Sequence, residues 1–277
     1  MEKKEFDIKV FEERSLDMRR EILRMLNEAG SGHSGGSLSS IDLLNVLYFY
    51  KMNHRSYDPS WKERDRFIMS KGHASPAVYV TLANCGYFPK EELSGFRKLG
   101  RILQGHVHFK VPGVEFSTGS LGQGLAVAYG LALGKRLNNG SGDIYCMLGD
   151  GEMQEGSVWE TAMAAGNAGL GNLCAILDYN KIQETAHVDS VNSLEPLADK
   201  MKAFKWHVID IDGHDPGQIR DAFDEYSSIN DKPVFIIANT VKGKGVSFME
   251  GQNKWHGKAP DDKQLQEALT ELGGDDE

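Results

Sequence analysis

The sequence predicts an α/β fold, a doubly wound and mostly parallel sheet with helices on both faces. Short apolar runs are the first observation, because near-continuous Val, Ile and Leu content is typical of strands buried on both faces. Helical segments of ten or more residues lie between these runs, which favours parallel strands. Glycine, histidine or another polar residue follows nearly every run. The expected strands cover residues 67–70, 144–148, 174–177, 207–213 and 234–238.

The N-terminal part begins with a helical pattern. Apolar positions between residues 16 and 26 recur at helical spacing. Gly30 follows, and we expect the stretch SGHSGGSLSS, residues 31–40, to form a small-residue loop. Residues 41–52 are apolar enough for a buried helix. Residues 64–87 then predict a strand, a glycine turn and a helix in succession.

A second glycine-rich passage, residues 117–137, predicts a loop that turns into a helix packed by Ala, Val and Leu. Residues 155–168 predict another helix between two expected strands. There is no internal repeat and no long linker. We therefore expect residues 1–277 to form a single domain.

Composition and charge exclude several protein classes. Apolar residues make up 40% and charged residues 26%, which excludes a disordered or collagenous chain. The 40 acidic and 31 basic residues give a net charge of −9, and no local basic stripe offsets it, so we expect no nucleic-acid partner. No run of 18 apolar residues occurs and the N-terminus lacks an apolar signal region. We expect no membrane partner and a cytoplasmic location.

The cysteines indicate neither a disulfide framework nor a zinc site. Cys85, Cys146 and Cys174 are an odd number, far apart and outside any metal-binding spacing. Cys146 and Cys174 lie in apolar runs, and we expect both to be core residues.

Polar side chains gather at the predicted strand ends. Residues 71–73, 149–151, 178–180 and 239–243 each follow an apolar run directly. Ligands of such sheets bind outside the carboxyl ends of the strands. A generic loop explains one of these stretches but not all together, so we expect a binding site at this edge.

The strongest local signal joins Asp150 and Asn180. Asp150 lies between two glycines at the end of one expected strand, and 28 residues separate Gly151 from Asn180 at the end of the next. Neighbouring parallel strands bring the carboxylate and the amide oxygen to the same edge. Hard oxygen ligands suit Mg²⁺, with Ca²⁺ or Mn²⁺ as alternatives, and leave room for phosphate oxygens on the metal. The flanking glycines allow close approach of a phosphate to the backbone.

This segment resembles the thiamine diphosphate binding motif, and nearly the whole chain resembles the N-terminal, pyrophosphate-binding domain of transketolases. The resemblance rests on motifs that occur in family order. They are SGHSGG, RDRFIMSKGHAS, GHVHFKVPGVEFSTGSLGQG, GDGEMQEGSVWE, LDYNKIQ and KGKGVSFMEGQNKWHGKAP.

The resemblance implies roles for particular residues. The metal ligands would be Asp150, Asn180 and the backbone oxygen of Ile182. Residues matching the family's histidines around the reacting carbons would be catalytic, namely His33, His106 and His256, since imidazole suits acid–base work near neutral pH. The remaining cofactor-binding residues would be His73, Gly119, Ser120, Leu121, Gly151, Glu155, Gln183 and Lys242, with Asn180 shared between metal and cofactor. Glu155 and Glu160 resemble a family pair that couples two cofactor sites.

The implied activity is reversible transfer of a two-carbon ketol unit from a ketose phosphate to an aldose phosphate in the pentose phosphate pathway, with thiamine diphosphate and a divalent metal. In the family, a glutamate of the pyrimidine-binding domain activates the cofactor, and no residue here matches it. The resemblance therefore implies a partner, the C-terminal transketolase subunit, which carries the absent pyrimidine-binding and C-terminal domains. We expect a heterotetramer, and no activity from this chain alone.

Several alternatives stay open. A sulfosugar transketolase or a deoxyxylulose phosphate synthase-like enzyme would share the cofactor site. A noncatalytic regulatory subunit could retain the fold, although the intact motif residues argue against it. A dinucleotide-dependent dehydrogenase is disfavoured because no GxGxxG opens a helix after a strand. Asn253 departs from one transketolase group, which has histidine there. Histidines outside the motifs are expected to be solvent or packing residues: His54, His187, His207 and His214.

Overall fold

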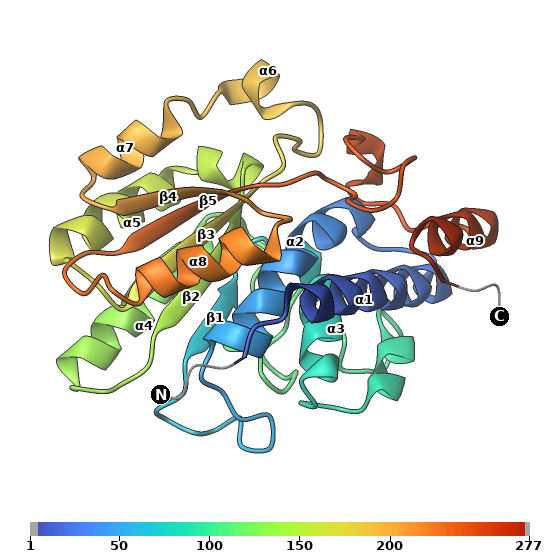
Figure 1. The fold of residues 1–277 in the computed structure, drawn as a ribbon, viewed down its shortest axis with the longest axis horizontal. Coiled ribbons are helices and arrows are strands. Elements are labelled where there is room, and N and C mark those ends of the chain that lie inside the picture. The colour runs from blue at the N-terminus through green and yellow to red at the C-terminus, as the bar shows by residue number, and fades with distance from the viewer. Residues whose placement is uncertain (1–4, 275–277) are drawn as a thin grey trace.

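A computed structural model describes residues 5–274. Within this range, five parallel strands form one sheet in the order β1-β2-β3-β5-β4, as Figure 1 shows. The predicted fold class is confirmed. Each expected strand is present within two residues of its predicted ends. The strands are β1 (Arg66–Met69), β2 (Ile144–Gly149), β3 (Leu173–Tyr179), β4 (His207–Asp212) and β5 (Val234–Asn239).

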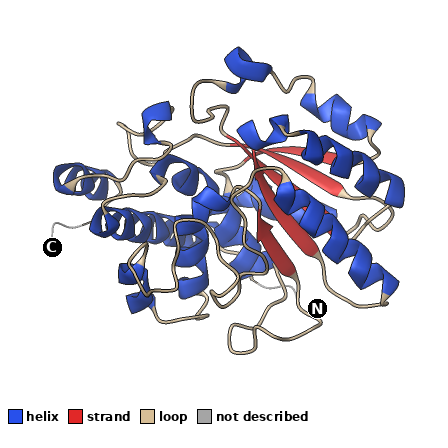
Figure 2. Ribbon diagram, turned by 180° about the vertical axis from the view of Figure 1, so that it is seen from behind, coloured by secondary structure: helices blue, strands red, loops and turns tan. Residues whose placement is uncertain are grey.

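Helices cover both faces of the sheet (Figures 1 and 2). Alternate strand residues point to opposite faces, so Tyr145 and Met147 of β2 join one core whereas Cys146 and Leu148 join the other. The first core is closed by α1 (Ile8–Ala29), α2 (Ser34–Val46), α3 (Ser75–Asn84) and α8 (Pro216–Tyr226). The second is closed by α4 (Gln123–Leu137), α5 (Gly156–Ala168), α6 (Val188–Asn192) and α7 (Leu197–Ala203).

Most of the small-residue stretch 31–40 is not a loop, and this expectation was wrong. Residues from Ser34 onward form the first turns of α2, in which every residue to Val46 is buried. Helix propensity of Gly and Ser is poor, but side chains of this size let the helix lie against the rest of the chain. A Cβ at Gly35 would lie 2.9 Å from Lys242 Cγ and 3.0 Å from the carbonyl oxygen of Trp255. Tertiary packing therefore overrides local preference here.

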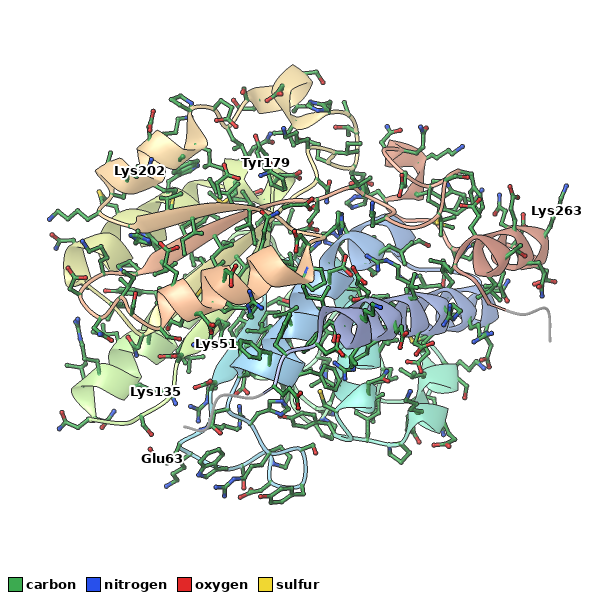
Figure 3. All side chains as sticks on the ribbon, viewed as in Figure 1. Lys51, Glu63, Lys135, Tyr179, Lys202 and Lys263 are labelled. Atoms are coloured by element: carbon green, nitrogen blue, oxygen red, sulfur yellow. The ribbon has the colours of Figure 1, made fainter. Side chains whose placement is uncertain are left out.

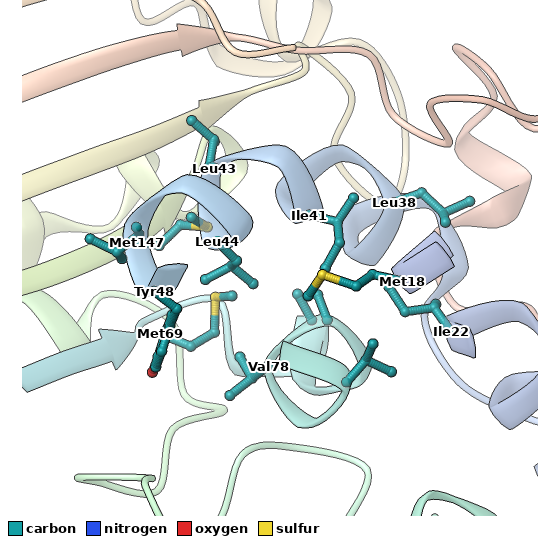
Figure 4. Packing of buried hydrophobic residues seen from close by; sticks show 14 of the residues in the cluster. Met18, Ile22, Leu38, Ile41, Leu43, Leu44, Tyr48, Met69, Val78 and Met147 are labelled. Atoms are coloured by element: carbon teal, nitrogen blue, oxygen red, sulfur yellow. The ribbon is translucent and has the colours of Figure 1, made fainter. Parts of the chain in front are cut away.

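The centre of the first core lies around α2. Figure 4 shows its apolar side chains between α1, α3 and the sheet, with Met18 on one side and Met69 and Met147 on the other. Burial of such side chains stabilises the fold by about 1.5–3 kcal/mol each. Figure 3 shows charged side chains such as Glu63 and Lys202 outside these cores, and both are exposed.

Shorter elements complete the chain. A π-helical turn (Leu47–Lys51) extends α2, and a 3-10 turn (Lys90–Gly95) follows α3. Helix α9 (Asp262–Glu271) begins with a capping box at Asp261 and packs against α1. Cys146 and Cys174 are buried in the cores as expected. No helix among the described residues is long and apolar enough to cross a membrane.

Candidate active site

A pocket of about 410 Å³ lies at the carboxyl edge of the sheet. The segments that follow β1, β2, β3 and β5 all reach it, as expected for a parallel sheet. The N-terminus of α2 and the segment around His256 close its other side. Of the site residues expected from the sequence, those that line the pocket are His33, His73, His106, Gly119, Leu121, Asp150, Gly151, Glu155, Asn180, Ile182, Gln183, Lys242 and His256.

The histidines of this pocket come from segments that are far apart in the sequence. His33 is the N-cap residue of α2 and His73 lies in the 3-10 turn Gly72–Ala74 after β1. The ring centroid of His33 lies 5.1 Å from that of His73, 5.9 Å from that of His106 and 5.5 Å from that of His256. His33 is therefore the centre of an imidazole cluster.

The environment favours the neutral form of these imidazoles. Burial, followed by the charges of His106 and Arg97, lowers the pKa of His33 to about 4. Burial is also the main cause that lowers the pKa of His256 to about 3, followed by Lys242. Burial lowers the pKa of His73 and His106 as well. At neutral pH each ring can then donate one hydrogen bond and accept another.

The oxygen atoms expected to hold a metal face the same pocket. Asp150 is only 3% exposed, and in the described chain its Oδ2 has no hydrogen-bond partner. Burial, followed by the charge of Asp178, raises the pKa of Asp150 to about 6. A buried carboxylate oxygen without a partner is costly unless a cation reaches it. Asn180 and Ile182 line the pocket beside it.

A metal site at Asp150 needs amide and backbone oxygen atoms as further ligands. Among residues 5–274, no three His, Cys, Asp or Glu side chains are grouped so that they could hold a metal ion. One carboxylate with neutral oxygen donors is a ligand set that suits Mg²⁺ with phosphate oxygens completing the shell. The donors around Asp150 therefore fit the expected metal, and their oxygen chemistry disfavours zinc.

Lys242 brings a positive charge into the same pocket. Its Nζ donates to the carbonyl oxygen of Ile182 at 2.8 Å and lies 2.8 Å from Nδ1 of His256. The side chain is 2% exposed, and burial lowers the pKa of its ammonium to about 8. A buried ammonium beside the glycine-flanked Asp150 suits an anionic ligand such as a diphosphate.

The glycine loop before α4 forms one wall. Gly119 and Leu121 line the pocket, and a Cβ at Gly119 would lie 3.3 Å from the ring of His106. Ser120 is exposed and does not line the pocket, unlike its neighbours. Its expected contact through backbone atoms stays a prediction.

Glu155 and Gln183 both line the pocket near the turn after β2. Glu155 is the exposed N-cap residue of α5, and Gln183 accepts a hydrogen bond from Gln154 at 3.0 Å. A Cβ at Gly151 would lie 2.9 Å from Cβ of Gln183, so these two segments approach closely. The Glu155 partner suggested by the family, Glu160, is exposed on α5 outside the pocket lining.

Sequence reasoning assigned no role to three buried charged residues at the pocket, of which Lys71 and Glu152 line it and Asp178 does not. Lys71 and Asp178 form a buried ion pair, with exposed side-chain fractions of 2% and 0%. Glu152 is also buried, and it accepts hydrogen bonds from Ser70 and from the backbone N–H of Gly122 at 2.9 Å. The sequence could have indicated a role for Asp178, because a charged residue within an apolar, buried strand needs a partner.

The histidines outside the motifs do not line this pocket. His214 donates from Nδ1 to Asp42 at 2.7 Å and accepts from the backbone N–H of Val241 at 2.8 Å, so it packs between elements. His207 lies 2.6 Å from Glu225 at the surface. The expected packing role of His214 is confirmed.

The sequence and fold are similar to those of known proteins. Residues 13–277 match the family described as transketolase, thiamine diphosphate binding domain. The 6-deoxy-6-sulfo-D-fructose transketolase subunit of a Clostridium strain is 42% identical over 256 residues, which cover 92% of this chain and 93% of that protein. An apulose-4-phosphate transketolase subunit from Phocaeicola vulgatus is 39% identical over 265 residues, 96% of this chain and 94% of that protein.

A crystal structure of transketolase from Campylobacter jejuni has the same fold. It superposes with a TM-score of 0.93 at 34% identity and covers 98% of this chain. This chain in turn spans 44% of that transketolase chain.

Proposed function

Because this chain belongs to the transketolase family through its thiamine diphosphate binding domain, we propose that it is the N-terminal subunit of a split transketolase. The transferase moves a two-carbon ketol unit from a ketose phosphate to an aldose phosphate, as in the pentose phosphate pathway. The observation that carries this proposal is the shared pocket, where the unpaired Oδ2 of Asp150 faces the same space as the histidine cluster around His33.

Asp150, Asn180 and the carbonyl oxygen of Ile182 would hold Mg²⁺. Two observations support this metal site: Oδ2 of Asp150 is buried without a partner in the described chain, and all three residues line the same pocket. The diphosphate would lie against Gly151, where backbone N–H groups and the metal neutralise its charge. Lys242, whose Nζ lies 2.8 Å from the carbonyl oxygen of Ile182, supplies a further positive charge.

The remaining cofactor contacts divide between the two ends of the pocket. His73 and Gln183 would border the diphosphate, and the 119–121 backbone would lie against the ring system. Thiamine diphosphate, when bound, supplies the electron sink for the two-carbon unit, while the protein supplies orientation and proton transfer.

His33, His106 and His256 would act on the sugar. Their lowered pKa values keep the rings neutral at pH 7, so each can donate a proton to a sugar oxygen or accept one from a hydroxyl. The Nδ1 atom of His33 is buried with no hydrogen-bond partner in the described chain, and His33 lines the pocket. His106 is exposed at the mouth of the pocket, where an incoming sugar would first meet the chain.

A second polypeptide would complete the site. Residues 1–277 would form one pyrophosphate-binding domain, and the partner would supply the pyrimidine-binding and C-terminal domains. Residues 1–4 and 275–277 lie outside the described structure. Two relatives of nearly the same length carry the word subunit in their names. In a heterotetramer, each cofactor would contact the pyrophosphate-binding domain of this chain and the pyrimidine-binding domain of the partner.

We take two exposed apolar side chains on α4 and α5 as support for a partner. Leu137 of α4 is 73% exposed and Met163 of α5 is 56% exposed. A Cβ at Gly130 or Gly134 of α4 would meet nothing within 4 Å, so another polypeptide can approach the helix backbone there.

A sulfosugar donor is the second candidate. The relative at 42% identity is named for 6-deoxy-6-sulfo-D-fructose, and the relative at 39% for apulose 4-phosphate. Both names describe an anionic sugar. The residues proposed to bind the cofactor would be the same for either substrate.

The test combines the purified chain with its C-terminal partner. Thiamine diphosphate and Mg²⁺ binding is measured by calorimetry, and ketol transfer is measured with ketose phosphates and 6-deoxy-6-sulfo-D-fructose as donors. We expect neither protein by itself to be active and the mixture to transfer a two-carbon unit. Full activity of this chain alone would refute the split site. Absence of cofactor binding in the mixture would favour a noncatalytic role.

A further inference from the structure

Asp178 lies directly beneath the pocket, one residue before the end of β3. It pairs in register with Gly149 of β2, and its side chain is 0% exposed. Its Oδ2 forms an ion pair with Nζ of Lys71, and Ser39 and Thr240 donate hydrogen bonds to the same carboxylate. Asp178 is therefore a buried anion that does not face the ligand space itself.

Donors from widely separated segments converge on this carboxylate. Lys71 after β1 pairs with Oδ2 and also donates to the carbonyl oxygen of Gly36 at 2.9 Å. Ser39 of α2 donates to Oδ2 at 2.6 Å, and Thr240 after β5 donates to Oδ1. A buried ion pair contributes little to stability in itself, but it can specify one arrangement of the groups around it.

The arrangement specified here is that of the Asn180 side chain. Its Nδ2 donates to Oδ2 of Asp178 at 3.3 Å, and its Oδ1 accepts from the backbone N–H of Ile182 at 3.1 Å. An ionised carboxylate can only accept, so the amide must turn its NH₂ toward Asp178. Its oxygen accepts one hydrogen bond, from Ile182, and an amide oxygen has a second lone pair available for a metal in the pocket that Asn180 and Asp150 both line.

We propose that Asp178, held in place by Lys71, is a positioning residue that makes Asn180 present its oxygen, and not its nitrogen, to the metal. This inference rests on the proposed function, because it takes Asn180 as a metal ligand. An amide turned the other way would offer N–H groups to a cation, which repel it. Partners of this kind beneath metal ligands are worth about 10–100-fold in metal affinity.

The experiment measures Mn²⁺ binding by electron paramagnetic resonance, with the full chain, its C-terminal partner and thiamine diphosphate present. Asp178→Asn should raise the Kd for Mn²⁺ by about 10–100-fold. The matched control is Thr240→Val, which removes a hydrogen bond from the other oxygen of the same carboxylate. It should leave the Kd within about twofold of wild type, although it lowers thermal stability. Equal weakening by both variants would mean a merely structural role and would overturn the proposal.

A second substitution tests orientation directly. Asn180→Asp offers an oxygen whichever way the group is turned, so it should restore Mn²⁺ affinity to the Asp178→Asn chain. In the wild-type background the same change sets two carboxylates against each other and should weaken binding. Failure to rescue would overturn the proposal. If Asp178→Asn does not fold, the Lys71→Met/Asp178→Asn chain, which leaves no unpaired buried charge, takes its place in both comparisons.

Asp150→Asn separates this inference from the proposed function. If that change leaves Mn²⁺ affinity unchanged, the metal site itself is wrong. If it abolishes binding while Asp178→Asn leaves the Kd within twofold of wild type, the site stands and the positioning role fails.

Discussion

Lys242 Nζ lies 2.8 Å from Nδ1 of His256, inside the pocket at the carboxyl edge of the sheet. An ammonium can only donate, so Nδ1 of the neutral ring is the acceptor and its proton lies on Nε2. The contact thus selects one tautomer of His256. The positive charge of Lys242 also opposes protonation of the His256 ring.

Lys242→Met is expected to raise the pKa of His256. Burial is the main cause of the low value, about 3, and Lys242 is the next, so the pKa should rise but stay below about 6.5. The measurement is a proton NMR titration of the His256 ring. Lys258→Met is the control, because Lys258 is exposed and lies 4.8 Å over the Trp255 ring. An equal shift in both variants would contradict the assignment.

Asp150→Asn is expected to abolish metal binding and yet stabilise the metal-free chain at pH 7. The pKa of this carboxyl is raised to about 6 in the folded state, mainly by burial, so its charge opposes folding at pH 7. Between about pH 4 and 6 the folded chain binds a proton that the unfolded chain does not, and stability rises as pH falls through this window.

A neutral amide removes that cost, and the free energy of unfolding should rise by about 1–3 kcal/mol at pH 7. Urea denaturation without metal measures it, and the gain should vanish near pH 4. A destabilised Asp150→Asn chain at pH 7 would show that the carboxylate has a partner in solution.

Asp42→Asn should destabilise the fold at a buried ion pair that does not line the pocket. Asp42 is paired with Arg19 at 2.5 Å and with His214 at 2.7 Å, and both Asp42 and Arg19 are buried. Removing one partner of a buried pair costs about 3–5 kcal/mol. Burial alone would raise the pKa of Asp42, but Arg19 and His214 lower it well below its ordinary value.

The stabilisation by Asp42 is therefore full above about pH 4 and lost as pH falls through the lowered pKa. Denaturation at pH 7 and pH 3 should show a smaller difference from wild type at pH 3. Asp17→Asn is the control, since Asp17 is in an exposed pair with Arg20 and should change stability by less than about 1 kcal/mol.

Gly124→Ala and Gly130→Ala, on the same helix α4, should have opposite effects. A Cβ at Gly124 would lie 2.3 Å from Ser70 Oγ and 2.6 Å from its Cα, so the backbone must move and stability should fall by about 1–3 kcal/mol. At Gly130 a Cβ meets nothing within 4 Å, and alanine should add about 0.5–1 kcal/mol to the isolated chain. Thermal unfolding of both variants measures the difference. A loss of stability at Gly130 would mean that this face of α4 is covered in the free chain.

Much of the fold was predictable because its signal is local. Strands such as β2 and β3 are continuous apolar runs, and their ends are marked by Gly149 and Asn180. The 31–40 stretch was predicted wrongly, because the closeness of Gly35 to Lys242 is set by residues 207 positions apart. No local pattern reports such a contact.

The sequence by itself determined which chemical groups stand at each strand end, since side-chain identity and strand periodicity are local properties. The tertiary structure alone decided their electrostatic state. Asp178 is ionised because Lys71 faces it, the Asn180 amide has one orientation because Asp178 lies beneath it, and Asp150 has a raised pKa because it is buried. Desolvation and charge pairing depend on which distant segments meet, and that is settled only when the chain has folded.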